Sequence, residues 1–275
     1  MAEEFWLLGG DERSRYSAEH LENHGFEVKT YGIPHKRDWQ LPKIFRQVIL
    51  PFPSFQGSLL RGHSAVPVEE LLCRIGEGTK VFGGLLAPWQ AEIEKQGGKV
   101  CDLYGSEPLT TRNAALTAEG AVCLAVSESP RALLGANCLV IGYGRIGRLL
   151  AQRLNSFAAK VTVAARKEAD LAAAEALGLR TDRTGQYFRG LSQYDFIFNT
   201  VPAPVLSREQ LQKLTPHCLL MDLASAPGGF STLDCAQLGL KSVNAAALPG
   251  RFSPQSAGAL YAQSILDLTL REEAL

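Results

Sequence analysis

Short hydrophobic runs alternate with longer polar or amphipathic stretches along the first half of the chain. The hydrophobic runs lie at 5–8, 26–31, 48–50, 80–82 and 99–101. Glycine pairs follow the first and the fourth run, and glycine at the end of a strand permits a tight turn or the close approach of a ligand. Repeats of strand, turn and helix are typical of a parallel sheet covered by helices. The pattern therefore predicts an α/β domain.

The same alternation continues in the second half, so a second α/β domain is expected there. Its hydrophobic runs lie at 138–141, 161–163, 196–198, 219–221 and 241–243. A helix-like stretch at 113–127 precedes these runs. After them, Ser253-Pro254 is a favourable helix start, with serine as N-cap and proline in the first turn. We expect both flanking helices to cross between the domains, and the C-terminal helix to pack on the first domain.

A Gly-x-Gly-x-x-Gly sequence marks the start of this second domain. Gly142, Gly144 and Gly147 directly follow the strand at 138–141 and open a helical run. In a dinucleotide-binding site the first glycine makes a tight turn, the second lets the backbone approach a pyrophosphate, and the third allows close packing of helix and strand. The helix N-terminus attracts the phosphates. The motif therefore predicts a nucleotide cofactor; the alternative is a Rossmann-like domain that binds none.

The end of the next strand favours NADP over NAD. An NAD-selective site places a carboxylate about 20 residues beyond the fingerprint, whereas an arginine there accommodates a 2′-phosphate. Here the strand at 161–163 runs into Arg166 and Lys167, without a carboxylate. Guanidinium matches the geometry of a phosphate. Alternatively, both cations are solvated residues at the start of a helix.

Three further loops follow strands of the second domain on the side of the fingerprint. They lie at 199–202, 222–229 and 247–254. The first offers an amide and a hydroxyl to the nicotinamide ribose, and the second is small enough to lie against a flat ring. Each alone is an ordinary turn rich in proline and glycine, but three at successive strand ends indicate a site. The expected cofactor-binding residues are Gly142, Gly144, Arg145, Ile146, Gly147, Arg166, Lys167, Asn199, Thr200, Val201, Pro202, Ala224, Ser225, Leu248 and Pro249.

These patterns predict an α/β protein of two Rossmann-like parallel-sheet domains joined by crossing helices. Residues 1–128 and the C-terminal helix 254–275 form the expected substrate-binding and catalytic domain. Residues 129–253 form the expected NADP-binding Rossmann domain. The length of 275 residues is compatible with two domains.

The amino-acid composition and net charge argue against some classes of binding partner. The chain has 28 Lys+Arg and 28 Asp+Glu, so its formal net charge is zero, which argues against a nucleic-acid-binding protein. No apolar run approaches the about 18 residues of a membrane span, and the acidic N-terminus does not resemble a signal peptide. The six cysteines are scattered, without zinc-like spacing. We expect buried, reduced thiols, no metal and no membrane association.

Candidates for acid–base chemistry are few. His63 lies in the glycine-rich stretch 57–65 and is a candidate for facing a cleft. Glu119 lies in the apolar stretch 113–127, where a carboxylate is costly unless it is paired. The alternative for Glu119 is a position on the solvent-facing side of the helix.

Several short motifs, spread over nearly the whole chain, resemble one known family. They are Leu8-Gly9-Gly10-Asp11 with Arg13, Val48-Ile49-Leu50-Pro51, Asn113 with Thr117-x-Glu119-Gly120, Gly142-x-Gly144-Arg145-x-Gly147, Ala165-Arg166, Asn199-Thr200-x-Pro202, Asp222-Leu223-Ala224-Ser225-x-Pro227-Gly228-Gly229, Leu248-Pro249-Gly250 and Ala257-Gly258. In this combination the chain resembles the family of the A-type subunit of dipicolinate synthase from spore-forming bacteria.

The resemblance implies NADP-dependent oxidation of a dihydrodipicolinate-type ring to pyridine-2,6-dicarboxylate (dipicolinate), on a branch of the lysine/diaminopimelate pathway. It also implies a flavoprotein-like partner, the B-type subunit of dipicolinate synthase, and work in the cytoplasm of the mother cell during sporulation. The oligomeric state is left open, a homo-oligomer included.

The expected catalytic residues follow from that substrate. Arg13, beside the turn at 9–11, is expected to clamp a carboxylate. Asn113 and Thr117 are expected to donate hydrogen bonds, and Glu119 to hold them in place or take a proton. We expect the dicarboxylate between Arg13 and the helix start at 113–119, facing the loop 224–229. The alternative is that Arg13 pairs with a neighbouring acid such as Asp11 or Glu12 on the surface.

Two other functions stay open at this stage. One is another two-domain NAD(P)-dependent dehydrogenase, of the alanine, 2-hydroxyacid or shikimate type. The first two types need a histidine or lysine base near the nicotinamide, and the third a Lys–Asp pair in the first domain; the sequence offers neither in a convincing place. The other is a non-catalytic module that senses a nucleotide.

Overall fold

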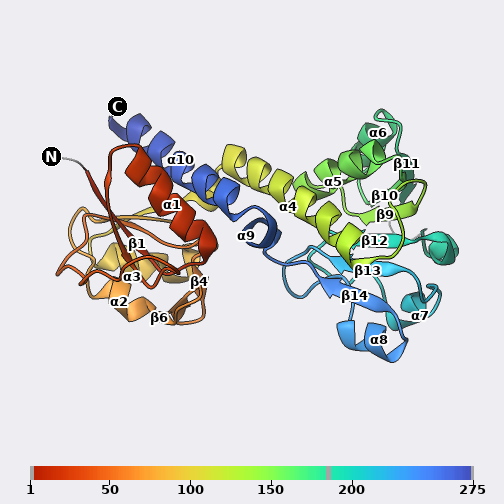
Figure 1. Ribbon diagram of the computed structural model, residues 1–275, viewed down its shortest axis with the longest axis horizontal. Helices are drawn as coiled ribbons and strands as arrows, with labels where there is room; N and C mark the ends of the chain where they lie inside the picture. The colour runs from red at the N-terminus through yellow and green to blue at the C-terminus, as the bar shows by residue number, and fades with distance from the viewer. Residues whose placement is uncertain (1–2, 184–186, 274–275) are drawn as a thin grey trace. The chain divides into compact units, whose positions relative to one another are not determined.

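The computed structural model describes residues 3–183 and 187–273 and consists of two compact α/β units (Figure 1). The first unit comprises Met1–Asn113 and Ser253–Leu275, and the second Ala114–Phe252. Each unit is built on its own parallel sheet. The fold class expected from the sequence, an α/β protein with two parallel sheets, is confirmed.

Helix α4 (Glu107–Glu128) contains the boundary between the units. The observed boundary falls between Asn113 and Ala114, whereas the sequence predicted it at residue 128, at the end of this helix. Packing explains the difference, because Ala118 and Leu124 are buried in the core of the second unit, whereas Leu109 is buried in that of the first. The helix also begins six residues before the expected Asn113.

The first unit contains a five-stranded parallel sheet. In sheet order its strands are β2 (Glu27–Tyr31), β1 (Glu4–Leu8), β3 (Gln47–Ile49), β7 (Lys80–Gly83) and β8 (Lys99–Asp102). The order 2-1-3-4-5 is that of flavodoxin-like sheets, and ligands of such sheets bind where the order reverses, beyond the carboxyl ends of β1 and β3. A small antiparallel sheet follows β3 and consists of β4 (Phe55–Gln56), β5 (Leu59–Leu60) and β6 (Val66–Pro67).

Helices cover both faces of this sheet. They are α1 (Glu12–Asn23), α2 (Val68–Leu72), η1 (Ala87–Trp89), α3 (Gln90–Lys95), η2 (Leu103–Gly105), the start of α4, and α10 (Pro254–Glu273). Strand β1 alternates in the expected way: Phe5 and Leu7 lie in one core cluster, and Trp6 and Leu8 in the other. Burying each such side chain contributes about 1.5–3 kcal/mol.

The C-terminal helix α10 packs against α1 within the first unit. Ile265 of α10 is fully buried with Leu21 of α1, and the Ser17 hydroxyl donates a hydrogen bond to the Gly258 carbonyl. Gly258 is required at this crossing, because a Cβ there would lie 2.3 Å from the Arg13 carbonyl oxygen. The hydroxyl of Ser253, the expected N-cap, is buried without a hydrogen-bond partner among the described residues.

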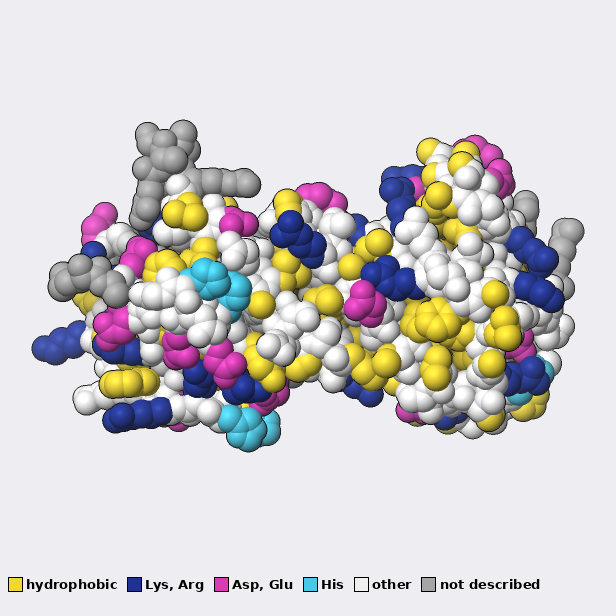
Figure 2. Space-filling view, turned by 45° about the horizontal axis from the view of Figure 1, so that its top comes forward, with side chains coloured by type: hydrophobic (Ala, Val, Ile, Leu, Met, Phe, Trp, Pro, Cys, Tyr) yellow, Lys and Arg dark blue, Asp and Glu magenta, His cyan; other side chains and the backbone are white. Residues whose placement is uncertain are grey.

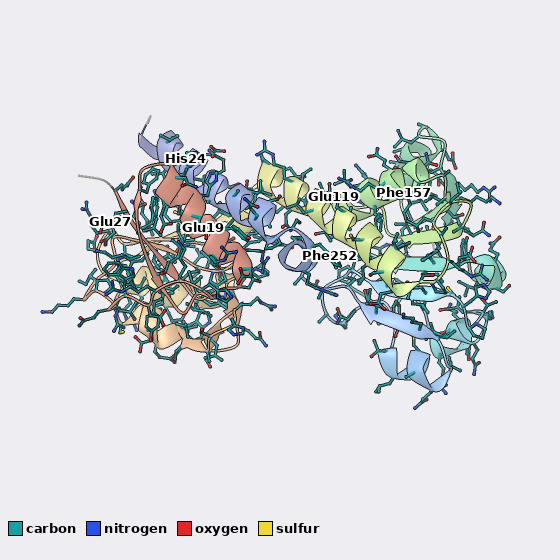
Figure 3. All side chains as sticks on the ribbon, in the orientation of Figure 1. Glu19, His24, Glu27, Glu119, Phe157 and Phe252 are labelled. Atoms are coloured by element: carbon teal, nitrogen blue, oxygen red, sulfur yellow. The ribbon has the colours of Figure 1, made fainter. Side chains whose placement is uncertain are left out.

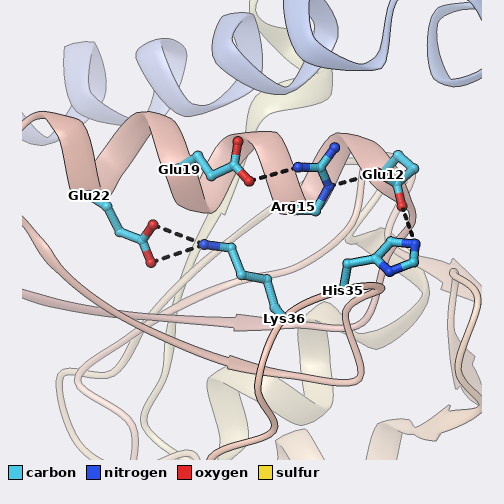
Figure 4. A network of polar contacts seen from close by, with 6 residues as sticks. All are labelled: Glu12, Arg15, Glu19, Glu22, His35 and Lys36. Carbon is cyan, nitrogen blue, oxygen red and sulfur yellow. Dashed lines mark hydrogen bonds and ion pairs between the residues drawn. The ribbon is translucent and has the colours of Figure 1, made fainter.

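A chain of ion pairs covers the exposed face of α1 (Figure 4). Arg15 bonds Glu12 at 2.7 Å and Glu19 at 2.8 Å, and Lys36 bonds Glu22 at 2.9 Å. Surface pairs of this kind contribute little stability, about 0–1 kcal/mol each. We infer that this network keeps the surface of α1 in contact with water and contributes little to stability.

The second unit contains a six-stranded parallel sheet. In sheet order its strands are β11 (Arg180–Arg183), β10 (Lys160–Ala165), β9 (Asn137–Ile141), β12 (Phe196–Asn199), β13 (Leu219–Asp222) and β14 (Lys241–Asn244). The order 3-2-1-4-5-6 is that of dinucleotide-binding Rossmann folds, whose ligands bind beyond the carboxyl ends of the first and fourth strands. Around the sheet lie α5 (Arg145–Ser156), α6 (Glu168–Glu175), η3 (Tyr187–Gln193), α7 (Arg208–Leu211), α8 (Thr232–Gln237) and α9 (Leu248–Phe252).

Both faces of this sheet are buried. Cys138 and Val140 of β9 belong to the core under α4 and α5, and Leu139 and Ile141 belong to the core on the other face. The cysteines are all reduced, and three of them are buried. The expectation of buried thiols is wrong for Cys73, which caps the end of α2, and for Cys123 of α4, because both are exposed.

The surface carries charges of both signs. On the face that Figure 2 shows, Lys and Arg side chains are interspersed with Asp and Glu, in keeping with the balanced composition. No helix in residues 3–183 and 187–273 is long and apolar enough to cross a membrane. The same residues contain no cluster of His, Cys, Asp or Glu that could hold a metal ion.

Candidate functional site

Close packing at the glycine fingerprint explains two of its three glycines. Gly142 ends β9 with a φ of 96°, and a Cβ there would lie 2.4 Å from the Thr200 hydroxyl oxygen. A Cβ on Gly147 would lie 2.2 Å from the Gly142 carbonyl oxygen. Real side chains do not approach this closely, so both positions need glycine. They bring the start of α5 against the end of β9, as the motif predicts.

The middle glycine is different, because it is open. Gly144 is exposed and immediately precedes α5, and a Cβ there would meet no described atom within 4 Å. The first-turn N–H groups of this 12-residue helix, which include those of Arg145 and Ile146, have no acceptor within the helix. An open glycine before the N-terminus of a helix fits the pyrophosphate of a dinucleotide.

Arg166 and Lys167 follow β10, and both are exposed. Neither side chain forms an ion pair within the described residues. The first acidic residues of α6 are engaged elsewhere: Glu168 pairs with Arg183, and Asp170 accepts from Arg148 at 2.7 Å. The end of β10 therefore presents two cations, and the two described acids at the start of α6 are paired with other residues.

Asn199 does not point toward a ligand. Its side chain is fully buried, and its amide donates to Asp222 Oδ1 at 2.8 Å and to the Val201 carbonyl at 2.9 Å. The Thr200 hydroxyl donates to the Ile141 carbonyl at 2.9 Å. In the structure the Asn199 amide is used by hydrogen bonds within the protein, and contact of these groups with the ribose stays a prediction. Asn199 and Thr200 hold the loop beside the fingerprint.

The loop after β13 is built around Asp222. Its Oδ2 accepts from the Gly229 N–H at 2.8 Å, and a Cβ on Gly229 would lie 2.3 Å from the Asn199 amide nitrogen. The tip of the loop faces outward: Ala224 is half-buried, and Ser225 is exposed. In the first of the three loops Val201 is half-buried and Pro202 exposed. These outward residues stay candidates for cofactor contact.

Leu248 and Pro249 are buried in the second unit. A Cβ on Gly120 of α4 would lie 2.8 Å from the Cβ of Leu248, so this leucine packs tightly on α4. Leu248 belongs to the core cluster of the second unit, and Pro249 beside it is buried; contact of these two residues with the cofactor stays a prediction.

A pocket lies at the point in the first unit where the strand order reverses. It is a small cavity of about 30 Å³ beyond the ends of β1 and β3. The lining residues are Gly10, Asp11, Arg13, Ser14, Pro51, Phe52, Arg61, Gly62, Leu109, Asn113, Ala257 and Tyr261. Two expected site residues, Arg13 and Asn113, thus meet in one pocket although they lie far apart in the sequence.

Arg13 is held rigidly in this pocket. Its Nε and Nη2 bond the Asp11 carboxylate at 2.9 and 2.8 Å, and its Nη1 donates to the Phe52 carbonyl at 2.9 Å. The alternative in which Arg13 pairs with Asp11 is therefore observed, but the pair lines a pocket. A guanidinium has five N–H donors, and these contacts use three, which leaves two for a ligand.

The Asp11 carboxylate is ionised beside Arg13. Burial raises its pKa, but the hydrogen bonds and the charge of Arg13 outweigh burial and lower the pKa below the usual 3.8. Asp11 also caps α1, because it accepts from the Arg13 N–H at 2.9 Å. A carboxylate with a lowered pKa is a weak base, so Asp11 positions Arg13 and is a poor proton acceptor.

Thr117 and Glu119 do not join this pocket. Thr117 is 8% exposed and belongs to the second unit. Glu119 is exposed on α4 (Figure 3), and it pairs with Arg153 of α5 at 3.0 Å. Six residues turn an α-helix by about 600°, so Glu119 leaves α4 on a different side from Asn113. The exposed side chain agrees with the solvent-facing alternative, and the role of Glu119 beside Arg13 stays a prediction.

Aromatic rings form part of the pocket wall, which sequence reasoning missed. Phe52 and Tyr261 lie with their ring centroids 5.4 Å apart. The Tyr261 hydroxyl donates to the Leu50 carbonyl at 2.9 Å, and burial raises the pKa of this hydroxyl far above its usual value. In the sequence Tyr261 is only one more position of the last helix, and its place beside β3 depends on how that helix packs.

Comparison with known proteins matches the second unit to a dehydrogenase family. Residues 123–227 match the family described as D-isomer specific 2-hydroxyacid dehydrogenase, NAD binding domain. The match spans β9 to β13 and the glycine turn between β9 and α5. It supports a nicotinamide cofactor and an oxidoreductase of the dehydrogenase type.

The whole chain is similar to one component of a known enzyme. It is 27% identical over 260 residues to the A-type subunit of dipicolinate synthase from Bacillus subtilis (strain 168), and the match covers 91% of this chain and 88% of the relative. The chain resembles the A-type subunit of dipicolinate synthase. The resemblance expected from the sequence motifs is thereby confirmed.

Two crystal structures of the same dipicolinate synthase component share the fold. The protein from Bacillus halodurans has a TM-score of 0.84 at 23% identity, and the match covers 97% of each chain. The protein from Bacillus subtilis has a TM-score of 0.84 at 24% identity, and the match covers 100% of this chain and 98% of the relative. Both relatives are described as the A-type subunit of dipicolinate synthase.

Proposed function

We propose that this chain is an NADP-dependent oxidoreductase subunit that oxidises a dihydrodipicolinate-type ring to pyridine-2,6-dicarboxylate. The observation that carries the proposal is the pocket of the first unit, which presents the fixed Arg13 guanidinium beside aromatic rings. The glycine turn of the second unit supplies a place for a dinucleotide. The resemblance to the A-type subunit of dipicolinate synthase supplies the identity of the ring.

The cofactor is assigned to the second unit. A nicotinamide bound there would supply the acceptor for the hydride of the ring. Gly144 and the first turn of α5 hold the pyrophosphate, and Gly142 and Gly147 set the distance between that turn and the strand. Arg166 and Lys167 bind the 2′-phosphate, because both are exposed and neither is neutralised by a described acid.

The substrate is assigned to the first unit. The two remaining N–H donors of Arg13 bind a ring carboxylate, while Asp11 and the Phe52 carbonyl fix the guanidinium. Phe52 and Tyr261 offer apolar surface to a flat ring, and Asn113 lines the same pocket. A carboxylate buried without a partner would lose several kcal/mol of hydration free energy, so an anchored guanidinium is the feature that this substrate demands.

Oxidation of the dihydro-ring removes one hydride and one proton, and the ring becomes aromatic. No histidine or lysine is among the described residues that line the pocket, and Asp11 is held as an ion by Arg13. We therefore assign the proton to solvent at the mouth of the pocket. Gain of aromaticity supplies much of the driving force, so orientation of the reactants is the main task of the protein.

The proposal includes the setting that the relatives imply. The chain works with a second, flavoprotein-like component, the B-type subunit, on a branch of the lysine/diaminopimelate pathway, in the cytoplasm of the mother cell during sporulation. Homo-oligomerisation is compatible with this scheme. A nucleotide-sensing module would need no anion pocket in the first unit, and a dehydrogenase of the 2-hydroxyacid or alanine type would need a histidine or lysine base. The pocket therefore favours the dicarboxylate proposal.

The test is the steady-state kinetics of Arg13→Ala and Arg112→Ala. Arg112 is the control, because it is exposed next to Asn113 and does not line the pocket. Loss of a charge-assisted contact of about 1.5–3 kcal/mol predicts a KM for the dihydro-substrate that is raised roughly 10- to 100-fold in Arg13→Ala. NADP affinity, titrated separately, should stay constant. Unchanged kinetics in Arg13→Ala together with a raised KM in Arg112→Ala would move the carboxylate site.

A further inference from the structure

We propose that Arg61 binds the second carboxylate of the substrate and makes the pocket selective for dicarboxylates. This inference rests on the proposed function and adds to it a residue that determines specificity. Arg61 lines the same pocket as Arg13, but it comes from the connection between β5 and β6 rather than from the turn after β1. Two separate segments of the chain thus bring guanidinium groups to one pocket.

Backbone contacts fix the position of Arg61. Its N–H donates to the Ser54 carbonyl at 2.8 Å. The next residue, Gly62, forms a parallel bridge with Gly10, and the His63 N–H donates to the Gly10 carbonyl at 2.8 Å. The backbone on both sides of the Arg61 side chain is therefore tied down, to the start of β4 and to the turn that precedes Arg13.

The bridge between Gly10 and Gly62 requires glycine on both sides. A Cβ on Gly62 would lie 2.3 Å from the Gly10 nitrogen, and a Cβ on Gly10 would lie 1.9 Å from the Ser14 hydroxyl oxygen. Any side chain at either position would push neighbouring atoms apart. This close approach places the backbone of Arg61 beside the turn that carries Asp11 and Arg13.

The charges of the pocket suit a second anionic group. Asp11 neutralises Arg13, with which it forms a bidentate pair. Arg61 is exposed, and no described residue forms an ion pair with it. The charged lining residues therefore leave one positive charge without a counter-charge from the protein. A carboxylate bound by Arg61 would supply that counter-charge, while the first carboxylate uses the two remaining donors of Arg13.

In this glycine-rich stretch the sequence points to His63 rather than to Arg61. The structure places His63 on the surface and outside the pocket lining, whereas Arg61, two residues earlier, lines it. A planar fork of N–H donors suits a carboxylate better than imidazole does. The two guanidinium groups form a two-point anchor for a flat ring with two carboxylates.

The test compares, by calorimetry, binding of the proposed product and of an analogue with a single carboxylate. Pyridine-2,6-dicarboxylate and pyridine-2-carboxylate are titrated into the wild-type chain, Arg13→Ala, Arg61→Ala, Arg61→Lys and Arg112→Ala. We expect Arg61→Ala to bind the dicarboxylate about tenfold more weakly and the monocarboxylate with unchanged affinity. Arg61→Lys should restore part of the loss, because it keeps the charge but not the fork. Arg112→Ala should bind both compounds like the wild type.

The outcomes separate this inference from the proposed function. Tight dicarboxylate binding that is lost in Arg13→Ala but kept in Arg61→Ala overturns the role of Arg61 and leaves the proposed function intact. Equal losses for both compounds in Arg61→Ala also overturn selectivity. If the wild-type chain binds neither compound, with and without NADP, the proposed function itself is contradicted. Thermal unfolding of each variant checks that the fold is kept. Because Arg61 is exposed, we expect its variants to unfold at the temperature of the wild type.

Discussion

Two alanine substitutions in the glycine fingerprint should have different effects on stability and the same effect on cofactor binding. In Gly147→Ala the new methyl group would lie 2.2 Å from the Gly142 carbonyl oxygen and 3.0 Å from its carbon. Both atoms belong to the backbone, so no side chain can rotate away. Helix α5 must move away from β9, and overpacking of this kind destabilises by about 1–3 kcal/mol.

In Gly144→Ala the new methyl group meets no described atom within 4 Å, and the φ of −76° suits alanine. Alanine restricts the unfolded chain, which stabilises by about 0.4–1 kcal/mol. It is also a poorer N-cap than glycine, by a similar amount. We therefore expect stability within about 0.5 kcal/mol of the wild type, because these two effects offset each other.

NADP binding should be lost in both variants for different reasons. The methyl group of Gly144→Ala would occupy the space that the pyrophosphate needs, whereas Gly147→Ala displaces the helix that binds it. The assays are urea unfolding followed by circular dichroism and NADP titration by calorimetry. Gly105→Ala is the control, because Gly105 is equally open and lies in the first unit. Wild-type NADP affinity in Gly144→Ala would refute the placement of the pyrophosphate at this turn.

Three further predictions follow from the charges and the buried thiols. Arg166→Ala should weaken NADP binding roughly tenfold and leave NAD binding nearly unchanged, as measured by titration with each cofactor; equal losses would contradict the 2′-phosphate assignment. Asp11→Asn keeps the helix cap but loses the charge pair, so it should destabilise by less than about 1 kcal/mol at pH 7. Because the pKa of Asp11 is lowered in the folded state, that difference should shrink as the pH falls from about 4 through the folded pKa; a difference in urea unfolding that does not shrink as the pH falls would contradict it. A thiol-specific reagent should react quickly with the exposed Cys73 and Cys123 at pH 8. Cys138 and Cys218, whose pKa burial raises to about 12, should react only after unfolding. Rapid reaction of Cys138 or Cys218 in the native protein would show that the core opens.

The sequence was sufficient to predict the buried strands and the glycine turn. Strands such as β9 and β12 are apolar on both faces, and that pattern is typical of a sheet that helices cover on two sides. Strand β11 was missed, because Arg180–Arg183 is a polar edge strand and pairs only with β10. The short strands β4 to β6 were missed as well, since two-residue strands leave no periodic pattern.

The candidate site was predictable in its loops but not in the direction of its side chains. Asn199 and Leu248 were correctly placed next to strand ends, yet both turn inward, because Asp222 and Gly120 offer them closely fitting neighbours. Arg61 was missed, because nothing local shows that Gly62 reaches back to Gly10. Contacts of that range depend on tertiary packing, which residue spacing does not reveal.

Reduction of NADP by the dihydro-ring tests the central claim most directly. The purified chain, with and without its flavoprotein-like partner, is mixed with NADP and freshly formed dihydrodipicolinate. Absorbance at about 340 nm, where the reduced nicotinamide absorbs, then follows NADPH, while chromatography measures pyridine-2,6-dicarboxylate. We predict that NADPH and dipicolinate form in equal amounts, and faster with NADP than with NAD. Dipicolinate formation at the rate of the uncatalysed control, with no reduction of either cofactor under both conditions, would contradict the account.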